Sequence, residues 1–197
     1  MTELDKLTEM FMKFPGIGPR QARRFVFFLL RQDAGYRNTL AKAITEVAST
    51  IKQCESCLRY STLLEDKCKI CSDSGREKSQ LMIVEKDTDI EQMEKSDAYK
   101  GMYFVLGGVM SLTGKKNYMR EKELSEYFKK NKLKEIIFAL STTTDGEYST
   151  QYLFDKIKDS ENLKGVKTTI LGRGLSTGSE LEYADAATLS QALKNRA

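Results

Sequence analysis

Apolar residues recur at helical spacing through the first fifty positions of the chain. Positions 4, 7, 10, 11 and 14 are all apolar, which predicts a short amphipathic helix over residues 3–13. Pro15 ends this helix, because the residue before a proline is disfavoured in the helical region, and Pro19 can open the next helix at its first position. A second helix is therefore predicted from Pro19 to about Arg31, and a third carries apolar residues at positions 40, 44, 47 and 51.

Short β-rich runs replace this pattern in the second half of the chain. They read LMIVE (81–85), YFVLG (103–107), EIIFAL (135–140) and TTILG (168–172). Helical stretches are predicted between them at 88–97, 121–131 and 149–159, and a last helix at 187–193. Strands that alternate with helices predict an α/β fold with a mostly parallel sheet and helices on both faces.

The changes of pattern divide the chain into four predicted parts. A helical module covers residues 1–53, a short polar segment with all the cysteines covers 54–77, and the α/β domain covers 78–173. A glycine-bearing tail covers 174–197. No internal repeat or low-complexity tract interrupts this order.

The composition is that of an ordinary globular protein. Of 197 residues, 40% are hydrophobic and 30% are charged, which excludes a disordered chain. No apolar run approaches the roughly 18 residues that a membrane span needs, and the start, MTELDKLTEM, is acidic and mixed, unlike a signal sequence. We expect a cytoplasmic protein without a membrane partner.

The net charge of +4 lies entirely in the helical module. Residues 1–53 carry nine Lys and Arg against five Asp and Glu, whereas residues 54–197 carry 23 of each. A basic module on a neutral body fits a polyanionic partner. Charge alone fits a solvated helix surface equally well.

The stretch FPGIGPRQARR (14–24) predicts a hairpin between two helices. Gly16 and Gly18 are expected to take positive φ and to let the backbone approach another surface. The free amides of the following helix can bind an anion, and Arg20, Arg23 and Arg24 stand in its first two turns. A tight turn between packed helices is the alternative. The two prolines and three arginines favour a clamp on a nucleic-acid backbone phosphate that reads no base edges.

Four cysteines follow the spacing C-x2-C-x10-C-x2-C, and the chain has no histidine. Cys54, Cys57, Cys68 and Cys71 can offer four thiolates to one tetrahedral metal, which predicts one structural Zn²⁺ per chain. Iron would bind the same four sulfurs, and the sequence does not decide between them. A full set of four ligands leaves no open position for catalysis, and the absence of histidine excludes mechanisms that need an imidazole.

Acidic residues follow two of the predicted strands. Glu85 closes the first strand, and Asp145 and Glu147 follow the third. Ligands of open α/β sheets collect beyond the carboxyl ends of the strands, so these carboxylates could hold Mg²⁺ or share acid–base work. The alternative is that they are ordinary acids in exposed loops. In the tail, Arg173 could bind an anion, but a loop leading into the last helix is favoured.

The order of these motifs resembles the bacterial recombination mediator family RecR along nearly the whole chain. The hairpin PGIGPRQARR, the cysteine pairs, LMIVE, YFVLGG, TTTDGE and RGLSTGSELEYADAATL occur in the order of that family. The block 81–173 resembles its Toprim domain, a Rossmann-like fold. The resemblance implies a DNA-binding, non-enzymatic ring, usually a tetramer, in DNA repair. With RecO, and in some settings RecF, such a ring helps to load RecA onto gapped DNA coated with single-strand-binding protein.

The resemblance also implies roles for individual residues. It assigns the zinc to Cys54, Cys57, Cys68 and Cys71, DNA contacts to Arg20 and Arg24, and the Toprim acids to Glu85, Asp145 and Glu147, with no requirement for Mg²⁺. The tail is expected to serve in oligomerisation. Two positions depart from the family: Ser176 stands where proline is usual, and Asp145-Gly-Glu replaces the commoner Glu-Gly-Glu.

Two other functions compete with this interpretation. A Mg²⁺-dependent Toprim nuclease or primase-like enzyme needs the same acids. A redox protein with iron in the cysteine site would leave the basic hairpin and the α/β body unexplained.

Overall fold

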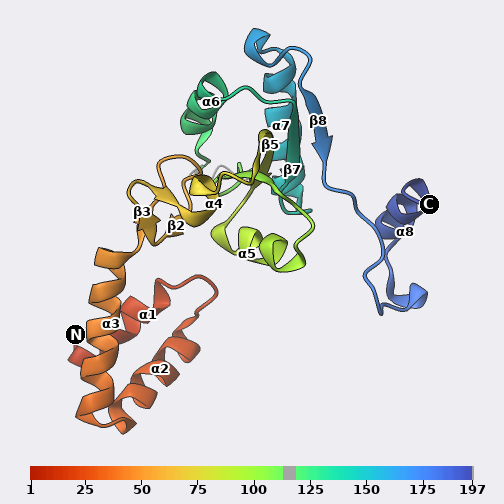
Figure 1. Ribbon diagram of the computed structural model, residues 1–197. Coiled ribbons are helices and arrows are strands. Elements are labelled where there is room, and N and C mark those ends of the chain that lie inside the picture. Colours follow the sequence, from red (N-terminus) through yellow and green to blue (C-terminus); the bar gives the residue numbers. More distant parts are fainter. Residues whose placement is uncertain (113–118, 197) are drawn as a thin grey trace. The chain divides into compact units, whose positions relative to one another are not determined.

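The computed structural model describes residues 1–112 and 119–196. Its helices are α1 (Glu3–Met12), α2 (Pro19–Arg31), α3 (Ala34–Thr50), α4 (Lys69–Ser72), α5 (Asp87–Ser96), α6 (Glu121–Lys130), α7 (Thr144–Lys158) and α8 (Ala186–Lys194). Short 3-10 helices are η1 (Glu161–Leu163) and η2 (Leu181–Tyr183). The strands are β1 (Lys52–Gln53), β2 (Tyr60–Ser61), β3 (Leu63–Leu64), β4 (Lys67–Cys68), β5 (Glu77–Val84), β6 (Gly101–Val105), β7 (Glu135–Ala139) and β8 (Lys167–Ile170) (Figure 1).

The chain forms two compact units, residues 1–52 and residues 53–197. The first holds α1, α2 and α3, and the second holds the cysteine segment, the sheet and the tail. None of the described helices is long and apolar enough to cross a membrane.

The second unit is built on a four-stranded parallel sheet in the order β6-β5-β7-β8. Met82 of β5 pairs with Tyr103 of β6 on one side and with Ile137 of β7 on the other. Helix α5 covers one face, and α6 and α7 cover the other, as right-handed crossovers require for this strand order (Figure 1). The predicted α/β fold with a Toprim-type parallel sheet is confirmed.

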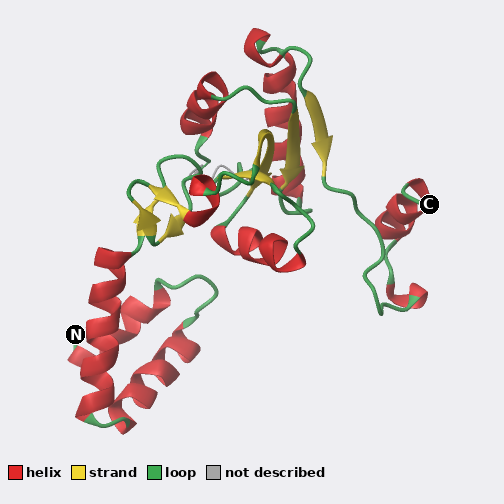
Figure 2. Ribbon diagram, viewed as in Figure 1, coloured by secondary structure: helices red, strands yellow, loops and turns green. Residues whose placement is uncertain are grey.

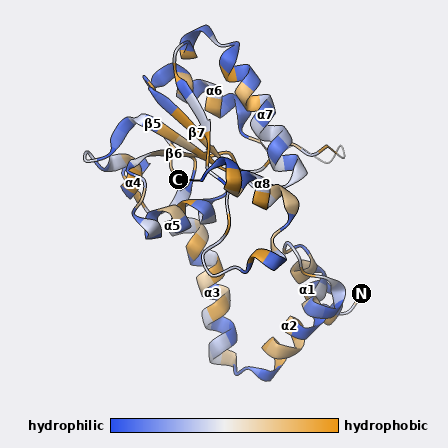
Figure 3. Cartoon of the chain, turned by 90° about the vertical axis from the view of Figure 1, so that its right-hand side faces the viewer, coloured by the Kyte–Doolittle hydropathy of each residue, from blue (hydrophilic) through white to orange (hydrophobic). Residues whose placement is uncertain are grey.

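The core of this unit follows from the apolar strands. Residues 81–84 and 102–106 are buried, as are Ile136 and Phe138 of β7. Figure 3 shows hydrophobic colour along these central strands and alternating bands on the helices, which pack one face each. From the helices, Ile90, Leu124, Leu153 and Ile157 complete the core.

Most predicted elements lie where the sequence placed them. The largest error is the start of α7, which was predicted at residue 149 and lies at Thr144. The stretch TTTDGE reads as a turn, but Thr143 caps a helix there, since its hydroxyl accepts a hydrogen bond from the Gly146 amide (3.2 Å). The helix passes so close to the preceding loop that a Cβ at Gly146 would lie 2.1 Å from the Ser141 carbonyl oxygen. Glycine is therefore required at this point by packing and not by a turn.

The short elements of the cysteine segment were not predicted. The segment holds two pairs of two-residue strands and the single turn of α4. They are drawn as short arrows and a short coil in Figure 2. Elements this short leave no periodicity in the sequence.

We expect Gly146→Ala to destabilise the protein. Alanine favours a helix by up to about 1 kcal/mol over glycine, but the clash with the Ser141 carbonyl should outweigh this gain and leave a net loss of about 1–3 kcal/mol. Urea unfolding followed by circular dichroism measures the loss. Gly172→Ala is the control, because a Cβ there meets nothing within 4 Å. If Gly146→Ala were as stable as this control, the close approach of α7 would be wrong.

Candidate functional site

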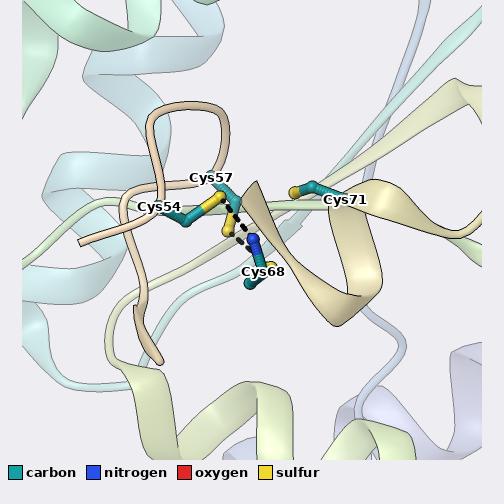
Figure 4. A group of neighbouring side chains, drawn as sticks. All are labelled: Cys54, Cys57, Cys68 and Cys71. Carbon is teal, nitrogen blue, oxygen red and sulfur yellow. Dashed lines mark hydrogen bonds between the residues drawn. The ribbon is translucent and has the colours of Figure 1, made fainter. Parts of the chain in front are cut away.

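The four cysteines come together as one buried cluster. All are free thiols, and their sulfurs lie within 4.8 Å of one another. The sulfurs of Cys57 and Cys68 are 3.6 Å apart, and the Cys68 amide donates to the Cys54 sulfur (3.3 Å). Figure 4 shows the side chains converging from two separate turns of the chain.

Two local structures present these thiols. In the first, Leu58 takes a positive φ of 59° and its amide donates to the Cys54 carbonyl (3.0 Å), which closes the turn over Cys54 and Cys57. In the second, the β3–β4 hairpin leads directly into α4, with Cys68 at its N-terminal cap and Cys71 inside it. Each pair of cysteines is thus held by a tight turn, and the hairpin brings the second pair to the first.

The cluster fits a metal such as zinc. Four sulfurs about 2.3 Å from a tetrahedral zinc lie about 3.8 Å from one another, which is close to the separation of Cys57 and Cys68. The hydrogen bond with Cys57 lowers the pKa of the Cys54 thiol, and the same contact raises the pKa of Cys57. A thiol with a raised pKa, such as that of Cys57, keeps its proton until a metal displaces it. Metal binding must therefore release protons from the cluster. Four thiolates close the coordination sphere and leave the metal a structural role.

The cysteine cluster is joined to the edge of the parallel sheet. The Val105 amide at the end of β6 donates to the Cys57 carbonyl (2.9 Å). The Arg120 guanidinium donates to the Leu58 carbonyl (3.0 Å) and to the Val105 carbonyl (3.1 Å), so it bridges the cysteine turn and the strand. No sequence pattern predicts this role of Arg120, because an arginine that binds backbone carbonyls has no motif.

The hairpin of the helical unit has the predicted form, with one correction. Gly16 takes φ +76°, but Gly18 is extended, with φ −86°. Gly18 is the N-cap of α2, has no side-chain cap, and is followed by Pro19 at the first helical positions. A Cβ at either glycine would meet nothing within 4 Å. Since no contact inside the chain requires Gly18, its small size leaves the helix amides open to an outside group.

The three predicted arginines are exposed at the start of α2. Arg20, Arg23 and Arg24 have no ion pair with a carboxylate among residues 1–52, all of which the structure describes. Arg24 makes only a long hydrogen bond to the Gln21 side chain (3.4 Å). Arg23 also interacts electrostatically with the Asp5 carboxylate. Three cations without an ion pair thus lie in the first two turns of α2, and both these cations and the helix dipole favour an anion there.

The predicted acids lie at one end of the sheet but form no metal-binding group. Glu85 directly follows β5, and its side chain is only 11% exposed and pairs with Lys86 (3.1 Å). Asp145 and Glu147 lie in the first turn of α7. The alternative interpretation, in which they are ordinary acids in an exposed loop, placed them wrongly. Three or more His, Cys, Asp or Glu side chains can together hold a metal ion. Among the described residues, the four cysteines are the only such group.

Each acid of α7 already has a partner in the chain. The Asp145 carboxylate accepts a hydrogen bond from the Leu112 amide (3.1 Å), and Glu147 pairs with Arg173 (2.6 Å). Arg173 is also fixed through its carbonyl, which accepts from the Asn195 side chain (2.7 Å). The alternative of an anion site at Arg173, which the sequence left open but did not favour, therefore meets a guanidinium already paired with a carboxylate of the same chain.

Three family models match the chain in the order of these structures. RecR, helix-hairpin-helix, matches residues 4–48; Toprim domain matches residues 79–168; and RecR, C-terminal, matches residues 174–197.

Curated relatives match over nearly the full length. The chain is 34% identical to Recombination protein RecR of Cereibacter sphaeroides, over 98% of this chain and 96% of the relative. It is 37% identical to the proteins of the same name from Desulfatibacillum aliphaticivorans (98% and 95% covered) and Enterococcus faecalis (97% and 94%).

We expect the purified protein to contain about one zinc per chain. Cys68→Ser should lose the metal and much of the folding stability, because structural zinc contributes roughly 10–16 kcal/mol in finger peptides. Metal analysis by plasma mass spectrometry and thermal unfolding measure both effects. Ser56→Ala, which alters the same turn but no ligand, should keep the metal. A coloured, iron-loaded protein, or a metal-free one with two disulfides, would refute the assignment to zinc.

Proposed function

The chain belongs to the RecR family of recombination proteins, and we propose that it is a DNA-binding recombination mediator. The family gives it a role in recombination and repair. In the finer proposal it forms a ring-like clamp in the bacterial cytoplasm, associated with the nucleoid. With RecO, and with RecF in some settings, the clamp promotes RecA loading on gapped DNA coated with single-strand-binding protein.

The observation that carries this proposal is the open hairpin at the start of α2. The uncapped amides after Gly18 and the unpaired cations Arg20, Arg23 and Arg24 converge on one exposed helix end. Amides and arginines at a helix N-terminus suit a phosphate group of the DNA backbone. Such contacts carry no base information, so we propose binding to duplex and gapped DNA without sequence preference.

The exposed apolar side chains of the helical unit support an oligomer. Within residues 1–52, all described, only Ala22 and Val26 are buried. Phe14, Phe28 and Ile44 are each at least half exposed. Exposed apolar groups on this scale mark a protein interface, and a second copy of the chain is the occupant that a ring supplies. Several hairpins around one DNA would raise their effective concentration and turn weak single contacts into a usable clamp.

We propose that Glu85, Asp145 and Glu147 bind a protein partner and perform no catalysis. Asp145 and Glu147 lie beyond the carboxyl end of β7, where they contact the Leu112 amide and Arg173, and Glu85 follows β5 at the same end of the sheet. An acidic surface can dock a basic partner. RecO is the candidate that membership of the family supplies.

Charge reversal at Arg20 and Arg24 together tests DNA binding. We expect the Arg20→Glu, Arg24→Glu variant to bind DNA more weakly, by a similar factor for every sequence. The slope of log affinity against log salt should shrink by about 0.7–0.9 for each lost contact. Fluorescence anisotropy with labelled gapped DNA measures both. Lys42→Glu with Lys52→Glu, which removes as much charge from the same unit, is the control. Binding with an unchanged slope in the arginine variant would place DNA elsewhere.

Alanine at Asp145 and Glu147 together tests the role of the acids. We expect weaker RecO binding in calorimetry, and DNA binding that is preserved or slightly stronger because negative charge is lost. Stability should fall by about 1 kcal/mol, since both acids interact favourably with the N-terminus of α7. Asp155→Ala with Glu161→Ala is the control for charge. If the native protein cut DNA with Mg²⁺ and the α7 variant did not, the chain would be a nuclease.

A further inference from the structure

Lysines gather at the end of the sheet opposite to the acids. The connections that lead into β7 and β8 lie side by side at this end (Figure 1), and the Lys167 amide donates to the Lys134 carbonyl (2.9 Å). Exposed lysines occupy both connections and the helix ends that precede them. We call the following set the lysine edge: Lys129, Lys130, Lys132, Lys134, Lys158, Lys164 and Lys167.

Local structure explains only part of this set. Lys129, Lys130 and Lys158 lie in the last turns of α6 and α7, where the helix dipole favours a cation. Lys167 pairs with Glu135 (2.9 Å), and Lys164 is 4.0 Å from Glu161. Lys132 and Lys134 lie outside any helix, and neither has an ion pair in the described part of the chain. The stretch 129–134 holds four lysines and no acid, although Glu135 follows it directly and the Glu77 carboxylate interacts electrostatically with Lys134.

A groove opens beside the lysine edge. It lies between α6 and α7, is closed by η1, and has a volume of about 440 Å³. Its walls are mainly apolar and include Leu153, Ile157, Leu163 and the half-buried ring of Phe128. Lys129 and Lys156 stand at its margin, and Lys156 is already paired with Glu121. Asp159 also lines the groove. The groove can take a flat apolar group against the Phe128 ring, and Lys129 lies at its margin.

We propose that the lysine edge and this groove form a second DNA contact surface, which binds a single strand. The lysines bind successive phosphates, and the groove takes one base against Phe128, the combination used by proteins that bind single strands without sequence preference. This inference rests on the proposed function in DNA binding. In the proposed function, the hairpin of α2 binds the phosphate backbone of DNA. This inference adds that the surface beside the sheet binds single-stranded DNA.

The distribution of the lysines favours DNA over an acidic peptide. A peptide with an apolar end in the groove needs cations only at the margin, where Lys129 is the one lysine not already paired with a carboxylate of the described chain. Lys132 and Lys134 continue the positive charge away from the groove along the next connection. A strand with one negative charge per nucleotide uses cations along its path.

Replacing three of these lysines by glutamine tests the proposal. The variant Lys129→Gln, Lys132→Gln, Lys134→Gln should bind labelled oligothymidine with a salt slope smaller by about 2, at about 0.7 per phosphate contact in a single strand. In about 0.1 M salt, this smaller slope corresponds to an affinity for oligothymidine roughly 30- to 100-fold lower than that of the native protein. The control Lys69→Gln, Lys95→Gln, Lys122→Gln removes three exposed charges from other parts of the same unit and should keep the native slope.

Phe128→Leu tests the groove with its apolar character preserved. A 2-aminopurine base in the oligonucleotide should lose fluorescence when it stacks on Phe128, and this quenching should disappear in the variant. One lost stacking contact should lower the affinity roughly fivefold or more. Unchanged quenching would overturn the groove as the base site.

The outcomes separate this inference from the proposed function. If the native protein bound no DNA, the proposed function would fail. If the hairpin variant bound weakly but the lysine variant bound oligothymidine like its control, the second surface alone would be refuted. A synthetic peptide rich in Asp and Glu and ending in Phe is the competing ligand. If it required the three lysines and oligothymidine did not, the surface would bind an acidic protein segment, and the proposal would be wrong.

Discussion

The parallel pairing of β5 with both of its neighbours is the constraint on which the second unit depends. When all strands point the same way, every connection from strand to helix leaves at one end of the sheet and every connection from helix to strand enters at the other. Glu85, Asp145 and Glu147 therefore share one end, and the lysines before β7 and β8 share the opposite end. The topology thus gathers residues that are far apart in the sequence at the two ends of one sheet.

The cysteine cluster extends this order to a segment that has almost no core of its own. Its strands are two residues long, and its only helix is a single turn. It is held by the four cysteines, which can close around a metal, and by the hydrogen bonds from Val105 and Arg120 to the turn over Cys57 and Leu58. The Tyr60 amide also donates to the Asp87 carboxylate of α5 (2.6 Å). The metal site and the end of β6 are thus mechanically coupled, which explains why the cysteines belong to the same buried cluster as the sheet.

The helical unit, residues 1–52, differs from the second unit in having almost no hydrophobic core. Three helices bury only two side chains fully, while several aromatic and aliphatic residues stay exposed. Such a unit gains its stability from what it binds, and both proposed partners, DNA and further copies of the chain, offer that gain. Its hairpin needs little internal packing, because Pro19 and the extended Gly18 define the start of α2 through the backbone itself.

Features that depend on local chemistry can be predicted from the sequence alone. Helical spacing and two prolines determine α1 and α2, apolar β-rich runs determine the four strands, and the spacing of Cys54, Cys57, Cys68 and Cys71 determines the cluster. Tertiary structure decided what depends on residues far apart in the chain. It placed Asp145 in a helix, since the cap at Thr143 and the close packing of Gly146 override the turn-like composition. It also paired Glu147 with Arg173 and assembled the lysine edge from separate connections, because the order of strands in a sheet is set by long-range packing that no local pattern records.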